Sequence, residues 1–183
     1  MSANDVMLGG GNALGMFYTA PENTALPAYP GASLAAWTHV GDVSEDGIDV
    51  DLKREFTSLK NWAGKIKRQQ PSKDPQTIKV PIMDTTKKVL EVVFGSNKVT
   101  TAAATSEHGN LITVDTSNGD TPGAAAYLFV MRDGDRLSYW GTKSGFVSSL
   151  DSLSFKPEDA VNWIATISSD AWIFVTDDGD VES

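Results

Sequence analysis

Hydrophobic and polar residues alternate along much of the chain, and this alternation predicts a mainly β protein. Ile48, Val50 and Leu52 alternate with charged residues, and residues 78–82 repeat the same two-residue period. Such a period is typical of a strand with one buried face. Because Pro81 cannot donate a hydrogen bond to a partner strand, we expect its strand to be bulged or to lie at a sheet edge.

The clearest hairpin in the sequence joins residues 124–132 to residues 135–140. Asp133-Gly134 separates these runs, and Asp-Gly favours a type I′ turn, whose twist fits paired strands.

Residues 157–168 have features of both helix and strand, and we favour a strand after a short turn. Further strands are expected at residues 34–40, 62–68, 98–104, 111–115, 146–150, 152–155 and 171–176.

One segment predicts a helix, over residues 84–94. Asp84 is a suitable N-cap, and Gly95 stands where a glycine commonly ends a helix. Five apolar residues form a helical stripe between them: Val89, Leu90, Val92, Val93 and Phe94. About ten strands and one helix predict a β-sandwich or barrel with a helix covering one side.

The 183 residues fit a single β domain with extended ends. Residues 1–33 are rich in glycine and proline and are expected to form an N-terminal arm and loop. Residues 34–178 form the predicted β domain, and residues 179–183 an acidic tail. Within the domain, residues 56–76 are expected to contain a long exposed loop.

Charge is segregated along the chain, although the total is only −9. Residues 1–52 sum to −7, residues 53–88 to +7, residues 89–150 to −2 and residues 151–183 to −7. Complementary charge sets register between partners, and two different patches meeting head to tail generate rings or filaments. We therefore expect self-assembly, although a solvated surface with no partner would also carry blocks of charge.

Several kinds of chemistry are missing from the sequence, and we expect neither an enzyme nor a cofactor or metal site. The chain has no cysteine and only two histidines, His39 and His108. No G-x-S-x-G or Walker sequence is present, and the Asp-Gly segments lack the spacing of calcium loops. The N-terminus does not resemble a secretory signal, and no apolar run is long enough for a membrane anchor.

Four segments resemble one family. VGDVSEDGI at residues 40–48 leads into FTSLKNWAG and IKR within residues 56–68. KVL and VFG follow within residues 84–95, and SFKPEDA occupies residues 154–160. Together these segments resemble the major tail protein, or tail tube protein, of bacteriophages with long non-contractile tails.

This resemblance implies a tail-tube-like β-sandwich or barrel that acts as a structural subunit. Six copies would form a ring with a continuous inner β-barrel, and rings would stack around a tape measure protein. The tube would later pass DNA without binding it specifically, and an acidic lumen would repel the phosphates. The implied partners include tail terminator and distal tail proteins, and the implied location is the virion, with assembly in the host cytoplasm.

The resemblance and the charge pattern together suggest which residues make contacts. Inter-subunit or inter-ring contacts are expected from Lys53, Arg54, Lys60, Trp62, Lys65, Lys67, Arg68 and Lys73. Arm contacts are expected from Met16, Phe17 and Tyr18. Candidates for an acidic lumen or interface are Asp42, Glu45, Asp46, Asp49 and Asp51.

Other functions fit some of the same residues. The five tryptophans could form a stacking platform for a carbohydrate- or receptor-binding module, although tryptophan is more often a core residue. Basic residues interleaved with Phe56 and Trp62 can indicate nucleic-acid binding, but a pI near 4.6 disfavours it. A hydrolase built on His39 or His108 has no supporting motif.

Overall fold

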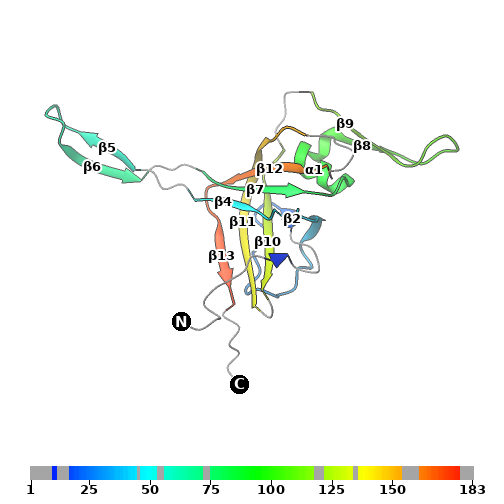
Figure 1. Cartoon of the computed structure of the whole chain (residues 1–183), viewed down its shortest axis with the longest axis horizontal. Coiled ribbons are helices and arrows are strands. Elements are labelled where there is room, and N and C mark those ends of the chain that lie inside the picture. The colour runs from blue at the N-terminus through cyan, green and yellow to red at the C-terminus, as the bar shows by residue number, and fades with distance from the viewer. Residues whose placement is uncertain are drawn as a thin grey trace, which may run out of the picture.

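The computed structural model describes residues 10–11, 17–44, 46–52, 56–71, 75–117, 122–133, 136–153 and 161–177. These residues form antiparallel sheets and one α-helix, in an open, sandwich-like arrangement (Figure 1). The mainly β fold with a single helix agrees with the sequence prediction.

The largest sheet contains nine strands, and every pairing within it is antiparallel. Its main path runs β3–β2–β10–β11–β12–β7–β4, while β1 pairs with β10 and β13 pairs with β11. The strands are β1 (Gly10–Gly11), β2 (Phe17–Pro21), β3 (Thr38–Gly41), β4 (Asp49–Asp51), β7 (Gln76–Ile82), β10 (Ala125–Asp133), β11 (Arg136–Leu150), β12 (Trp163–Ser169) and β13 (Ile173–Thr176).

The predicted β10–β11 hairpin is confirmed, with Asp133 opposite Arg136. The residues between them lie outside the described ranges. β11 is one 15-residue strand, whereas the sequence predicted two separate strands in this region. Gly141 serves close packing, because an added Cβ would lie 2.7 Å from Cδ2 of Leu26. An added Cβ at Gly145 would likewise lie 3.1 Å from the Ser168 carbonyl oxygen, so both glycines allow close packing within one continuous strand.

The sheet buries side chains on both of its faces. On β10, Tyr127 and Phe129 belong to a core shared with β7, β12 and the helix, and Leu128 and Val130 belong to a second core on the opposite face. Two-sided burial explains why β10 reads as a nearly continuous apolar run. It also fixes this strand at the centre of the molecule.

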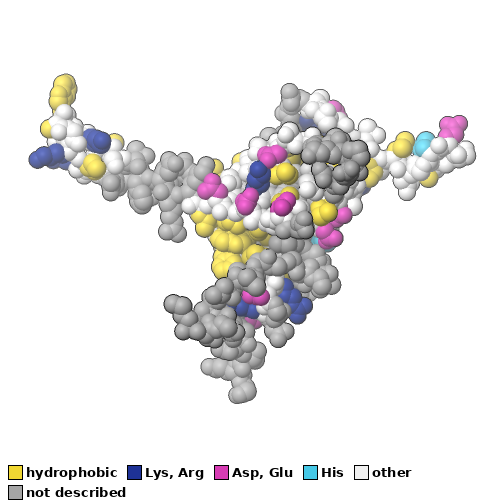
Figure 2. All heavy atoms as spheres, in the orientation of Figure 1, with side chains coloured by type: hydrophobic (Ala, Val, Ile, Leu, Met, Phe, Trp, Pro, Cys, Tyr) yellow, Lys and Arg dark blue, Asp and Glu magenta, His cyan; other side chains and the backbone are white. Residues whose placement is uncertain are grey.

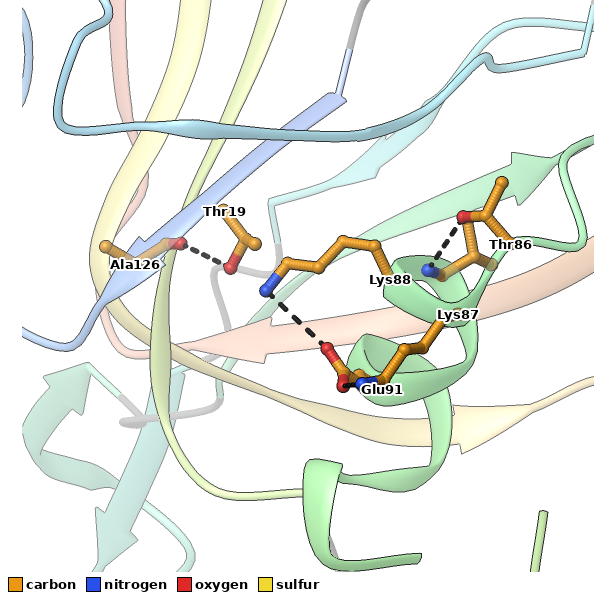
Figure 3. Close-up of polar contacts among 7 residues, drawn as sticks. Thr19, Thr86, Lys87, Lys88, Glu91 and Ala126 are labelled. Carbon is orange, nitrogen blue, oxygen red and sulfur yellow. Dashed lines mark hydrogen bonds and ion pairs between the residues drawn. The ribbon is translucent and has the colours of Figure 1, made fainter. Parts of the chain in front are cut away.

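The helix α1 (Lys87–Phe94) begins later than predicted. Thr86 is its N-cap, and the Thr86 side-chain oxygen accepts a hydrogen bond from the N–H of Val89 at 3.3 Å (Figure 3). The prediction of Asp84 as the cap is wrong, because its carboxylate accepts instead from the N–H of Asp42. Gly95 ends the helix as predicted, with a φ of 96°, and a short 3-10 helix, η2 (Ser96–Lys98), follows.

Two hairpins extend from opposite sides of the body (Figure 1). One contains β5 (Phe56–Lys60) and β6 (Ile66–Pro71), and the other contains β8 (Val99–Ala102) and β9 (Leu111–Val114). The expected long loop over residues 56–76 is therefore largely a hairpin. Its turn is closed by Asn61, whose N–H donates to the Lys65 carbonyl and whose side-chain oxygen accepts from the Lys65 N–H.

Pro81 lies in an interior strand, which its sequence context did not predict. β7 pairs with β12 along one side, and with β4 only over Thr77 to Lys79 on the other. Beyond β4, Ser44 donates its N–H to the Pro81 carbonyl beside an isolated bridge. The proline is tolerated because it falls where this neighbouring ladder has already ended.

Candidate assembly surfaces

The β5–β6 hairpin brings together several of the predicted contact residues. Lys60, Lys65, Lys67 and Arg68 are all exposed, and Trp62 is fully exposed at 106%. Figure 2 shows basic and hydrophobic side chains on this projecting hairpin. The other three predicted basic residues, Lys53, Arg54 and Lys73, lie outside the described ranges.

The same hairpin exposes aliphatic side chains that have no core to enter. Leu59 is 54% exposed and Ile66 is 53% exposed. An isolated two-stranded hairpin is marginally stable in water, and apolar residues rimmed by charge are typical of an interaction surface. This basic, apolar hairpin therefore has the composition of a docking element.

Phe17 and Tyr18 occupy a different place from the one predicted. They belong to β2, and Phe17 is completely buried, with its ring stacked 4.7 Å from that of Phe129. Tyr18 packs edge-on against His39. The expectation of arm contacts is corrected for both residues, because these side chains fill the chain's own cores. Met16 lies outside the described residues.

The predicted acidic residues separate into two groups. Asp42 lies 3.7 Å from the His39 ring nitrogen, and Asp46 accepts a hydrogen bond from Ser44 in the loop that follows β3. Asp49 and Asp51 lie on β4 and are exposed. Glu45 lies outside the described ranges. The structure thus gives the two β4 carboxylates a common strand face, apart from the loop residues.

One section of the sheet has a polar side that the core does not cover. In β4, β7, β12 and residues 146–150 of β11, alternate side chains such as Val50, Ile78 and Ile167 point into the core with α1. Among the residues between them, Pro81 and Ser168 are buried. We define the open face as the exposed or half-buried residues on this side, together with Asp151 at the end of β11: Asp49, Asp51, Thr77, Lys79, Phe146, Asp151, Ile164 and Thr166. Figure 2 shows mixed charge gathered over β4 and β7.

Lys79 and Asp151 form the closest ion pair on the open face. The Lys79 ammonium nitrogen lies 2.6 Å from a carboxylate oxygen of Asp151. This hydrogen bond and the negative charge of Asp151 raise the pKa of Lys79, and Asp49 contributes to the rise. Sequence reasoning did not single out either member of the pair. The alternation in residues 76–82 was the available signal, since it places Lys79 opposite the buried side chains.

Two hollows border the two cores. One, of ≈ 410 Å³, is mainly apolar and lies between the loop around Pro30 and strands β10 and β11. The other, of ≈ 450 Å³, lies between α1 and β2, with Thr19, Lys88 and Glu91 in its lining (Figure 3). Glu91 is 4.0 Å from Lys88 and 3.5 Å from Lys87 on the same helix. Surface pairs of this kind are weak.

The tryptophans do not gather into one platform. Trp37 and Trp172 are buried, and Trp140 and Trp163 are half-buried, so that Trp62 alone is fully exposed. Trp163 also packs edge-on against Phe94 of the helix. This arrangement favours the core role of tryptophan over a ligand-stacking surface.

The described part of the chain contains no cluster of three His, Cys, Asp or Glu side chains suited to holding a metal ion. Within the same ranges, no helix is both long and apolar enough to cross a membrane. The two histidines belong to different elements, with His39 in β3 and His108 in the segment between β8 and β9.

Comparison with known proteins identifies the family. A family model described as phage tail tube protein matches residues 1–167. No curated protein matches the chain. Because the family match spans most of the sequence and accompanies a mainly β fold with one helix, the chain belongs to the phage tail tube protein family.

Proposed function

We propose that this tail tube subunit forms hexameric rings, which stack around a tape measure protein into a channel for DNA ejection. Membership of the family makes the chain a structural component of the phage tail and of the virion. The ring number, the contents of the tube and the passage of DNA are our proposal. One observation carries it: the four-stranded section, made of β4, β7, β12 and residues 146–150 of β11, has two edges that no described strand covers.

These open edges lie at the two ends of the section. β4 pairs only with β7 among the described strands. At the other end, residues 146–150 of β11 pair with β12 on one side, while β10 pairs with β11 only as far as Gly145. Unpaired edges are a hazard in a monomer, and an assembly that pairs them removes the hazard.

The section has four strands, and an even number of antiparallel strands can repeat around a ring. Successive strands in this section are antiparallel, so β4 runs opposite to β11. If β4 of one copy lies beside residues 146–150 of the next, the alternation of strand direction continues unbroken around the ring. The contact joins two different surfaces and is therefore heterologous, which generates a closed ring when the rotation per copy permits.

The two sides of this section suggest which one faces the channel. α1 and the core occupy one side, and the open face occupies the other. Three aspartates, Asp49, Asp51 and Asp151, share the open face with a single lysine, Lys79. A polar wall with excess negative charge repels phosphate within about 8 Å at physiological salt. We therefore assign the open face to the channel.

The β5–β6 hairpin then has the role of linking copies. It projects from the body beside β4 and carries exposed Trp62 together with four basic side chains (Figure 1, Figure 2). Aromatic and basic residues are enriched at protein interfaces. Docking on an acidic surface of a neighbouring copy, within a ring or between rings, would bury these side chains.

Electron microscopy of the purified protein tests the assembly. We expect rings or tubes, and six-fold symmetry in end views. Protein that stayed monomeric at high concentration, with or without its virion partners, would contradict the proposal.

The absence of cysteine allows the channel wall to be tested separately. Thr166→Cys on the open face and Lys143→Cys on an exposed part of β11 can each be labelled with biotin before assembly. Streptavidin–gold is expected to decorate the walls of Lys143→Cys tubes and to leave those of Thr166→Cys tubes bare. Equal decoration of both kinds of tube would contradict the assignment of the open face to the channel.

A further inference from the structure

Lys79 places a positive charge on the surface that we assign to the channel. Among the described residues of β4, β7, β12 and residues 146–151, it is the only lysine or arginine. Its side chain is 42% exposed, so that a passing phosphate could reach it. A fixed ammonium in every copy would give DNA a repeated binding site along the tube.

The structure supplies a counter-charge for this lysine. A carboxylate oxygen of Asp151 lies 2.6 Å from the Lys79 ammonium nitrogen, and Asp49 is directly opposite Lys79 in the β4–β7 pairing. The Asp151 backbone N–H donates to the Ile164 carbonyl at 3.0 Å. This backbone bond fixes Asp151 at the end of β11, beside the lysine.

We propose that Asp151 masks Lys79, so that the described strands of the channel wall offer passing DNA no unpaired ammonium group. The inference rests on the proposed channel function. Asp151 is a positioning residue in this account, because it acts through Lys79 and not by contact with DNA. The hydrogen bond to Asp151 and its negative charge also raise the pKa of Lys79, as expected when a carboxylate stabilises the charged form of a lysine.

The chemistry of DNA binding predicts the effect of removing the mask. Each phosphate contact by a lysine makes binding to duplex DNA salt-dependent, with a slope of about −0.9 in log K against log salt concentration. Copies arranged around and along the tube would present many such lysines to one duplex. Even weak single contacts then add up to retention, because later contacts are intramolecular.

The experiment compares assembled tubes of the wild type, Asp151→Asn, and the double variant Lys79→Gln/Asp151→Asn. Tubes are first confirmed by electron microscopy and then mixed with a short fluorescent DNA duplex at low salt, and the DNA that sediments with them is measured. We expect Asp151→Asn tubes to retain about tenfold more DNA than wild-type tubes, and added salt to abolish the difference. The double variant should return to the wild-type level.

Several outcomes would overturn the masking role. Asp151→Asn tubes that retain no extra DNA would do so, as would a double variant that retains as much DNA as the single variant. If Asp151→Asn does not assemble, Thr166→Lys replaces it, because this change adds a second cation opposite Lys79, where one Asp151 carboxylate cannot neutralise both charges. Intact Thr166→Lys tubes that retain only the wild-type amount would also reject the inference. Failure of wild-type protein to form tubes would instead count against the proposed function.

Discussion

The carboxylate of Asp84 accepts a hydrogen bond from the backbone N–H of Asp42, with 2.7 Å between oxygen and nitrogen. This bond joins the segment before α1 to the end of β3, 42 residues earlier in the chain. The contact leaves little room beside it, because a Cβ added to Gly41 would lie 2.9 Å from the same Asp84 oxygen. The long-range hydrogen bond between Asp84 and Asp42 and the close packing of Gly41 therefore involve the same Asp84 oxygen.

Asp84→Ala is expected to destabilise the protein more than Thr86→Ala. Removing Asp84 leaves the Asp42 N–H without its charged acceptor, and hydrogen bonds to charged groups contribute about 1.5–3 kcal/mol. Removing the Thr86 cap typically costs about 1 kcal/mol. Urea unfolding of the two variants measures the difference in unfolding free energy. A larger loss of unfolding free energy in Thr86→Ala would show that the Thr86 cap stabilises the fold more than the Asp84–Asp42 hydrogen bond does.

Gly41→Ala should also destabilise the fold, by about 1–3 kcal/mol through overpacking. Besides the Asp84 oxygen, the new methyl group would lie 3.0 Å from Cγ2 of Val89 in the helix. Gly123→Ala is the matched control, since an added Cβ there meets nothing within 4 Å. Thermal unfolding should show a lower Tm for Gly41→Ala alone, and equal Tm values would refute the steric argument.

These residues also show what the sequence could and could not predict. The apolar stripe and Gly95 located the helix correctly, because both signals are local. Asp84 and Thr86 are both good N-caps by residue type, and the choice between them depends on a partner, Asp42, that is distant in sequence. A local pattern cannot contain that information.

The same limit explains the errors at Phe17 and Tyr18. Three apolar residues after a glycine-rich segment fit an arm as well as they fit a strand, and only pairing with β10 distinguishes the two. The β10–β11 hairpin was predictable because its turn signal and apolar runs are contiguous. The open face was not, because it requires knowing that β4, β7 and β12 are neighbours.

Tyr127 predicts a loss of stability at high pH. Burial raises its pKa to about 12, whereas an unfolded tyrosine titrates near 10. Between these values the unfolded state binds fewer protons than the folded state, so stability falls as pH rises. The stabilisation is complete below about pH 10 and is lost through pH 12, to a total on the order of 2–3 kcal/mol.

Tyr127→Phe is the control for this effect, because it removes the titrating hydroxyl and keeps the ring. Burial also raises the pKa of Tyr18 and Tyr139, but both remain in the variant and their effects cancel in the comparison. Urea unfolding at pH 9, 10 and 11 should show a steeper decline for the wild type. Parallel declines would mean that Tyr127 ionises equally in both states.

Trp62→Ala should impair assembly and leave the stability of the single chain nearly unchanged. Its side chain is fully exposed, so truncation creates no cavity within the subunit, whereas aromatic anchors often dominate binding energy at interfaces. Trp172→Ala is the opposite case, because that ring lies in the core beside Phe129 and its loss should cost about 3–5 kcal/mol. Normal tube formation by Trp62→Ala would exclude Trp62 as an anchor.

Reversing charge on the hairpin tests whether electrostatic attraction drives docking. Lys65, Lys67 and Arg68 are exposed on the turn and on β6, so changing all three to glutamate should leave the subunit folded. Like charges across an interface oppose association, and the triple variant should therefore fail to form tubes when its acidic partner surface is unchanged. Light scattering and electron microscopy measure assembly, and circular dichroism checks the fold.

A charge-conserving variant separates this effect from simple damage to the hairpin. Lys65→Arg, Lys67→Arg and Arg68→Lys together keep all three positive charges, and this variant should assemble like the wild type. Salt provides a second check, because screening weakens exposed charge pairs and should slow wild-type assembly as ionic strength rises. If the glutamate variant forms normal tubes, hairpin charge plays no part in the contact, and the exposed apolar side chains must carry it alone.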